Sequence, residues 1–142
     1  MRHLEDNLQM ECLKWWNYTF NSKPKIQILL HHSPNGGYRR VKEAERFKKM
    51  GVRAGFPDLI LCMKSADEQY IGLFIELKVP PNTQYPTQYL YQQAVEAQSY
   101  KYVIVKSFDQ FKEEIMKYMG IDEKSDVQSA RKQLSAFLAK NV

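Results

Sequence analysis

Two apolar runs on either side of a polar segment stand at the centre of the chain. The runs cover residues 59–63 and 70–79, and the segment 64–69 between them is polar. This pattern is typical of two antiparallel strands joined by a turn. A hairpin that is symmetric about this turn places Asp58 opposite Glu76. The sequence therefore predicts that two carboxylates face each other across a strand pair.

The two strands differ in how their apolar residues are spaced. Between 71 and 79 the odd positions are apolar, whereas Glu76 and Lys78 occupy even positions. Side chains alternate between the faces of a strand, so one face is expected to be core and the other to carry a carboxylate beside an ammonium group. Residues 59–63 are all apolar, which predicts a central strand that is covered on both faces.

The rest of the pattern predicts helices around this hairpin. Helices are expected at 2–20, 41–50, 86–99, 108–119 and 123–140, and further strands at 26–32 and 102–105. A helical crossover from 79 to 102 makes the last strand parallel to the one before it, with a right-handed connection. These elements predict an α/β fold with a mixed β-sheet flanked by helices. Residues 1–122 are expected to form the domain, and 123–142 an amphipathic helix packed on it or on a partner subunit.

Length and composition limit the class of protein. A chain of 142 residues fits one domain. It has no apolar run of about 18 residues, so no membrane span is expected, and its start has no apolar signal region. Cys12 and Cys62 both occupy apolar positions, which predicts two buried free thiols in a reducing compartment. A cytoplasmic location is therefore expected.

The charge of the chain is unevenly distributed. The formal net charge is +5, which favours a polyanionic partner, although a mildly basic protein without such a partner has the same value. The positive residues cluster just before the first apolar run, at Arg39, Arg40, Lys42, Arg46, Lys48, Lys49 and Arg53. They are either a solvated helix face or contacts to DNA phosphates. His31 and His32, at the end of an expected strand, are either structural or in contact with a phosphate.

The carboxylate pair and the neighbouring lysine are suited to a divalent-metal site. Mg²⁺ takes oxygen ligands and keeps several waters, so Asp58 and Glu76 would hold it and leave room for a substrate phosphate. Lys78 would then orient or deprotonate the attacking water, or stabilise negative charge in the transition state. The alternative is an ordinary Glu–Lys pair on a solvated strand face, with an unrelated aspartate in a turn.

Two segments carry a resemblance to a known family: Gly55-Phe56-Pro57-Asp58-Leu59 and Ile75-Glu76-Leu77-Lys78. They resemble the metal-dependent nuclease superfamily whose motif is written PD-(D/E)xK and, within it, the VRR-NUC branch of virus-type replication and repair nucleases. The resemblance spans about residues 5–118. It also includes Glu5, Gln9, Gly51, Thr87, Gln88, the strand 102–105 and Ser107.

The resemblance implies a restriction-endonuclease-like core and Mg²⁺-dependent hydrolysis of DNA, with Mn²⁺ as a substitute. It implies metal ligands at Asp58, Glu76 and the carbonyl of Val79. It also implies an active site completed by Lys78, by Gln88 from the helix after the lysine strand, and by Glu5 from the first helix. Glu11 is the rival to Glu5 if the register of that helix is misread, and a solvated helix charge is the other interpretation of Glu5.

The resemblance also suggests a substrate and an assembly. Stand-alone members of the branch are similar to four-way-junction (Holliday junction) resolvases that act as dimers, which implies a branched DNA substrate and a homodimer. A non-catalytic nucleic-acid-binding module with a nuclease-like fold is the competing interpretation. A small-molecule enzyme and an RNA-directed hydrolase are further alternatives.

Overall fold

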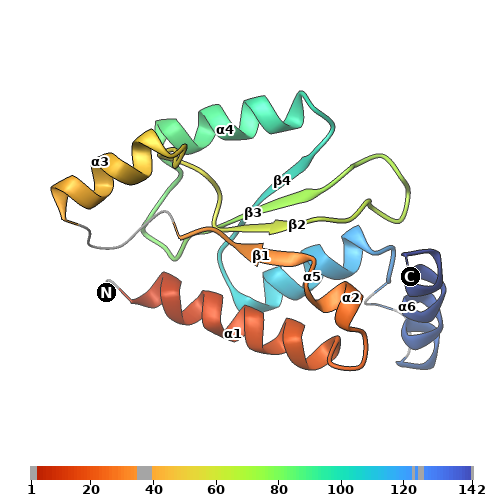
Figure 1. Ribbon diagram of the computed structural model, residues 1–142. Coiled ribbons are helices and arrows are strands. Elements are labelled where there is room, and N and C mark those ends of the chain that lie inside the picture. The colour runs from red at the N-terminus through yellow and green to blue at the C-terminus, as the bar shows by residue number, and fades with distance from the viewer. Residues whose placement is uncertain (1–2, 35–39, 123, 125–126, 142) are drawn as a thin grey trace.

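The central hairpin forms as the sequence predicts, within a four-stranded sheet (Figure 1). The computed structural model describes residues 3–34, 40–122, 124 and 127–141. Its helices are α1 (Leu4–Thr19), α2 (Pro24–Gln27), α3 (Val41–Lys49), α4 (Pro86–Glu96), α5 (Phe108–Tyr118) and α6 (Val127–Asn141). Its strands are β1 (Leu30–His32), β2 (Leu59–Leu61), β3 (Leu73–Leu77) and β4 (Lys101–Val105).

The strand order is β1-β2-β3-β4, with antiparallel pairs at β1–β2 and β2–β3 and a parallel pair at β3–β4. In the β2–β3 pair Leu59 lies opposite Ile75, so the next position along the same register places Asp58 opposite Glu76. The predicted mixed sheet, the hairpin register and the parallel last strand are confirmed. The regular strands are shorter than the apolar runs that predicted them.

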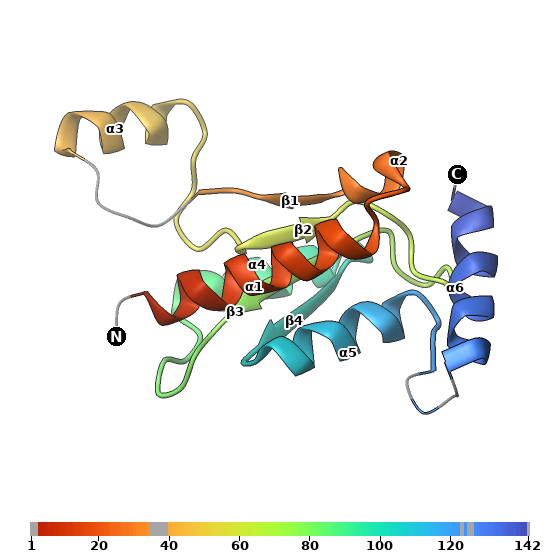
Figure 2. The same cartoon turned by 90° about the horizontal axis from the view of Figure 1, so that it is seen from below.

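Helices cover both faces of the sheet. In Figures 1 and 2, α4 lies on one face, and α1 and α5 lie together on the other. The odd residues of β3, Leu73, Ile75 and Leu77, are buried in the main core with side chains from α1 and α5. The even residues of β3 face α4, and they are buried as well: Phe74 is 6% and Glu76 3% exposed. The charged face of this strand is therefore covered.

Two predictions about the first half of the chain are wrong. Residues 26–32 do not form one strand, because Pro24 begins the short helix α2, and regular pairing starts only at Leu30. Cys12 is buried as predicted, but Cys62 is exposed. Cys62 lies just after β2, between the buried Leu61 and Met63, so its side chain alternates to the opposite face from theirs. The first apolar run is therefore covered fully on one face only.

The two outlying helices are attached differently. α3 has no buried side chain and lies away from the sheet (Figure 2). α6 contributes Phe137 and Leu138 to the main core, so its apolar side packs on this chain. None of the described helices is both long and apolar enough to cross a membrane.

Candidate active site

Segments distant in the sequence meet at one edge of the sheet. The start of β2, the end of β3, the start of α4 and the start of α1 all lie at this edge (Figure 1). The antiparallel β2–β3 register brings the beginning of one strand beside the end of the other. The predicted residues Asp58, Glu76, Lys78, Gln88 and Glu5 belong to these segments.

Asp58 precedes β2 and is fixed by hydrogen bonds to both neighbouring strands. Its Oδ2 accepts a hydrogen bond from the N–H of Leu77 at 2.8 Å. Its carbonyl oxygen lies 2.8 Å from Nδ1 of His32, which places a ring N–H donor on β1 against it. Because Pro57 before it is buried, the approach of the chain is rigid. His32 therefore has a structural contact here, in line with the structural interpretation.

Glu76 lies near the end of β3 and is almost completely buried. Its Oε1 accepts a hydrogen bond from Nε2 of Gln88 at 2.8 Å. Its Oε2 is also buried, and no donor in the described part of the chain reaches it. A buried carboxylate oxygen without a donor costs free energy. The site therefore contains one oxygen that calls for a ligand.

Burial changes the pKa of both carboxyl groups. The pKa of Glu76 is raised to about 9, mainly by burial and next by the negative charge of Asp58, whereas Lys78 lowers it. Burial likewise raises the pKa of Asp58, against the lowering effect of the Leu77 N–H. The two groups are close enough to share a proton. The fully ionised pair is thus unfavourable by itself, and a bound cation would remove this cost.

Lys78 is buried beside the carboxylates, with 3% of its surface exposed. Its backbone N–H extends the pairing with β4 by donating to the carbonyl of Val105 at 2.9 Å. Its Nζ lies 4.0 Å from the centre of the Tyr85 ring. The ring stabilises the ammonium charge but accepts no conventional hydrogen bond. The N–H donors of Lys78 thus stay available to a phosphate or a water.

Gln88 joins the start of α4 to the carboxylate pair. Pro86 occupies the first turn of the helix, as is typical of helix starts. The Oε1 of Gln88 accepts a hydrogen bond from the N–H of Tyr85 at 2.8 Å, while its Nε2 donates to Glu76. The amide is thus held at both ends. Its orientation, and with it that of Glu76, depends on the position of this helix terminus.

Glu5 reaches the loop that follows β3. Its Oε1 accepts hydrogen bonds from Nδ2 of Asn82 at 2.8 Å and from the N–H of Val79 at 3.4 Å. Glu11, the rival position, is exposed. The structure therefore places Glu5 at the site edge, held by the loop and close enough for its charge to raise the pKa of both Asp58 and Glu76.

The carbonyl of Val79 already accepts a hydrogen bond from the N–H of Asn82 at 3.0 Å, so its role as a metal ligand stays a prediction. Leu77 offers another backbone ligand. Its N–H points to Asp58, and the carbonyl of a residue in an extended strand lies on the same side as its N–H.

The donor set fits Mg²⁺ better than zinc. No group of three or more His, Cys, Asp and Glu side chains that would hold a metal ion occurs within residues 3–34, 40–122, 124 and 127–141. Structural zinc needs four such ligands. Mg²⁺ is satisfied by one or two carboxylates and keeps its waters. The Asp58–Glu76 pair, with its unpartnered buried oxygen, meets that requirement.

The expected DNA-binding residues that the structure describes lie at the start of α3, on α3 and in the loop after it. Arg40, Lys42, Lys48, Lys49 and Arg53 are exposed, and Arg39 lies outside the described residues. They are at the same end of the sheet as the carboxylates (Figure 1). None of them belongs to the carboxylate site itself.

Two contributing side chains were not predicted from the sequence. Tyr85 contacts the ammonium of Lys78, and Asn82 holds Glu5. The signal for Tyr85 was its place directly before Pro86, at a helix start close to Gln88. Asn82 contacts a residue 77 positions away in the chain, and no local residue pattern shows such a contact.

Comparisons with known proteins agree with this arrangement. A family model described as the VRR-NUC domain matches residues 2–109. A solved structure named "VRR_NUC domain protein" is similar, with a TM-score of 0.67 and 31% sequence identity. The similarity covers 82% of this chain and 88% of that one. No curated protein matches the chain.

Proposed function

Because the chain belongs to the VRR-NUC family, whose domain is of nuclease type, we propose that it is a metal-dependent nuclease that hydrolyses DNA phosphodiester bonds at the Asp58–Glu76 site. One observation carries the proposal. Glu76 is 3% exposed and has an Oε2 that no described donor reaches, directly across the strand pair from a second carboxylate. Such an arrangement is costly in a purely structural role.

Asp58 and Glu76 are the residues that would hold the ion. A bound Mg²⁺ would supply a polarised phosphate oxygen and a water of lowered pKa. The chain itself fixes the geometry of the two carboxylates. The Leu77 N–H holds Asp58, and the Gln88 amide holds Glu76, at 2.8 Å each. These hydrogen bonds leave the second oxygen of Glu76 directed to the site.

Lys78 is the residue that we propose to handle charge and protons at the scissile phosphate. It is buried next to Glu76, and its ammonium rests on Tyr85 rather than in an ion pair with a described carboxylate. A cation in this position can orient the attacking water or stabilise negative charge on the phosphate. Glu5 supports the loop after Val79 from the side of α1.

The binding of DNA is assigned to the exposed positive residues of α3 and the following loop. A nucleic-acid backbone is bound mainly through such side chains, with strong dependence on salt. We further propose a branched DNA substrate and a homodimer, because two symmetric cuts require two sites at a fixed spacing. We also propose that the protein acts on DNA in the cytoplasm.

The competing function is a binding module that has the fold without the chemistry. The buried site argues against it. A module that only binds DNA gains nothing from two carboxylates beside phosphates, since like charges repel. A module that only binds DNA would also have no use for a buried lysine, Lys78, whose ammonium N–H groups have no assigned acceptor among the described residues.

The test is a cleavage assay on four-way-junction, linear duplex and single-stranded DNA, with Mg²⁺, with Mn²⁺ and with a chelator. Asp58→Asn is expected to abolish metal-dependent cleavage. Lys78→Ala is expected to bind metal but lose about two to four orders of magnitude in cleavage rate. Lys64→Ala, an exposed lysine in the turn between β2 and β3, is the matched control. Retarded migration of DNA without cleavage by the parent protein would overturn the proposal in favour of a binding module.

A further inference from the structure

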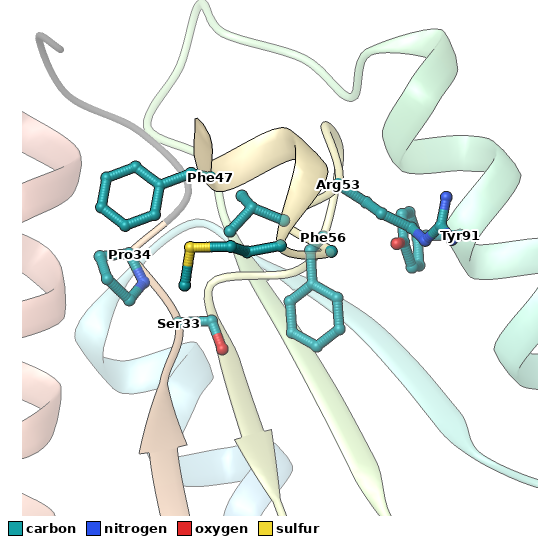
Figure 3. Close-up of a pocket in the computed structure, with 9 residues that line it drawn as sticks. Ser33, Pro34, Phe47, Arg53, Phe56 and Tyr91 are labelled. Atoms are coloured by element: carbon teal, nitrogen blue, oxygen red, sulfur yellow. The ribbon is translucent and has the colours of Figure 1, made fainter. Parts of the chain in front are cut away.

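A cavity of about 590 Å³ opens next to the candidate active site. It lies between α3, the loop that leads into β2 and the middle of α4 (Figure 3). Three aromatic side chains, Phe47, Phe56 and Tyr91, line it together with Met50 and Arg53. None of the residues that line it carries a carboxylate. The cavity therefore combines aromatic surface with a positive charge.

The aromatic walls are held by ring contacts rather than by hydrogen bonds. The rings of Phe56 and Phe74 meet edge to face, with centres 5.7 Å apart, and those of Phe56 and Tyr91 do so at 5.5 Å. Phe74 in turn packs on Tyr100 at 5.1 Å. This chain of rings continues along the face of the sheet that α4 covers. The wall formed by Phe56 and Tyr91 is thus rigid, and both rings remain partly exposed.

Positive charge surrounds the opening. Arg53 lines the cavity itself, and Figure 3 shows its side chain extending toward Tyr91. The guanidinium of Arg46 lies 5.8 Å from the centre of the Phe47 ring, and Lys48 and Lys49 are exposed on the same helix. An uncharged apolar ligand would not need positive side chains around the opening of the cavity. A ligand with flat apolar faces attached to a polyanion fits both properties.

We propose that this cavity binds an unpaired nucleobase of the DNA substrate. Its volume is within the usual range of about 300–1,000 Å³ for ligand sites, and stacking between aromatic rings is how proteins hold single-stranded bases. A fully paired duplex keeps its bases stacked inside the helix and cannot offer one. The cavity would therefore favour DNA with unpaired bases, as in a flap or at a branch point.

The position of the cavity links it to cleavage. Phe56 precedes Asp58 by two residues, so their Cα atoms are at most about 7.6 Å apart. A base in the cavity would thus lie close to the scissile phosphate. The inference rests on the proposed nuclease function and specifies the substrate class of the same site.

The test measures binding separately from cleavage. In a Lys78→Ala background with Mg²⁺, dissociation constants are measured for two DNAs: a duplex with a single-stranded flap that carries 2-aminopurine, and a fully paired duplex with the same paired sequence. Phe47→Ala and Tyr91→Ala are each expected to weaken flap binding about ten-fold, and paired-duplex binding by less than about two-fold. Phe47→Tyr should retain flap binding. Val41→Ala, which changes an exposed apolar residue on the same helix, is the control.

The outcomes separate the two proposals. Equal weakening for both DNAs, or none for the flap, would overturn the base-binding site. A parent protein that fails to cleave any DNA, while its flap preference depends on Phe47, would overturn the nuclease function and leave the base-binding site standing. Tyr91 packs on Phe56, so its variant must first be shown to fold. Phe47 belongs to a helix without buried residues, and the Phe47 variants therefore decide the question even if the Tyr91 variant unfolds.

Discussion

Two glycines at either end of the loop between α3 and β2 provide a matched test of how this loop positions the site. Gly51 and Gly55 both have positive φ angles, +107° and +84°. An alanine at either position would be strained by about 1–2 kcal/mol. The surroundings differ, however. A Cβ at Gly51 would meet nothing within 4 Å, whereas a Cβ at Gly55 would lie 2.7–2.8 Å from atoms of Thr87, two of them in its backbone.

This difference predicts unequal effects on stability. Gly51→Ala should lower the free energy of unfolding by the strain alone, about 1–2 kcal/mol. Gly55→Ala adds a backbone clash that no side-chain rotation relieves, so the loss should be about 2–5 kcal/mol. Urea unfolding followed by circular dichroism measures both values. Equal losses for the two variants would refute the reasoning, because they would mean that the loop and the start of α4 are not in contact.

The clash should also affect the chemistry. Thr87 precedes Gln88, whose amide donates to Glu76 at 2.8 Å, so displacement of Thr87 moves the partner of a proposed metal ligand. Under conditions where each variant is folded, Gly55→Ala should slow single-turnover cleavage by about ten-fold or more. Gly51→Ala should cleave at about the parent rate. A Gly55→Ala protein that cleaves normally would show that the position of α4 does not control the carboxylates.

Three further predictions concern charges in the site and the core. Glu76→Gln should stabilise the metal-free protein at neutral pH by about 1–3 kcal/mol, because a carboxyl group with a pKa raised to about 9 must take up a proton on folding, whereas the amide does not and keeps a hydrogen-bonding group. Thermal melts with and without Mg²⁺ should show that the variant also loses any rise in Tm on adding the ion. Tyr85→Ala should slow single-turnover cleavage at saturating DNA about ten-fold, whereas Tyr85→Phe should not, because the ring stabilises the ammonium group of Lys78, which lies 4.0 Å from the ring centre. Equal rates for the parent protein and both variants would contradict this role. Burial raises the pKa of the Cys12 thiol from 9.0 to about 12. Above pH 9 the unfolded chain therefore releases a proton that the folded protein keeps, and the free energy of unfolding falls as the pH rises. This one group should lower it by about 1.4 kcal/mol at pH 10. Urea midpoints at pH 8 and pH 10 should show that Cys12→Ala reduces this fall, whereas the control Cys62→Ala, at an exposed position, leaves it unchanged.

The hairpin was predictable because two independent sequence features, the polar turn and the alternation of apolar residues, give the same strand pairing. The polar turn fixes the midpoint between the strands, and the alternation in β3 fixes which residues share a face. Together they determine that Asp58 lies opposite Glu76, as the register shows. The end of α3 was predictable for a similar local reason, since Gly51 adopts a positive φ directly after the helix.

Other features depend on contacts between distant segments, which residue patterns do not encode. Cys62 has apolar neighbours on both sides in the sequence, and yet it is exposed, because exposure depends on what other segments cover that position. Gln88 is one of several glutamines in its region, and only the family resemblance singled it out. Its hydrogen bond to Glu76 needs the crossover from β3 to α4, so the pattern of residues around it contains no signal.

The covered face of β3 explains how the structure tolerates its own charges. Glu76 lies in a strand that is buried on both faces, and the buried Lys78 follows that strand directly; charged groups are normally excluded from such surroundings. Each has a partner from the start of α4: the Gln88 amide for Glu76 and the Tyr85 ring for Lys78. These partners stabilise each group without neutralising it, because an amide and a ring carry no net charge. An ion pair in their place would satisfy the fold and leave no charge available to a metal ion or a phosphate. The start of α4 therefore does more than cover the sheet, because it holds a buried carboxyl group and a buried ammonium group in place for a metal ion or a phosphate.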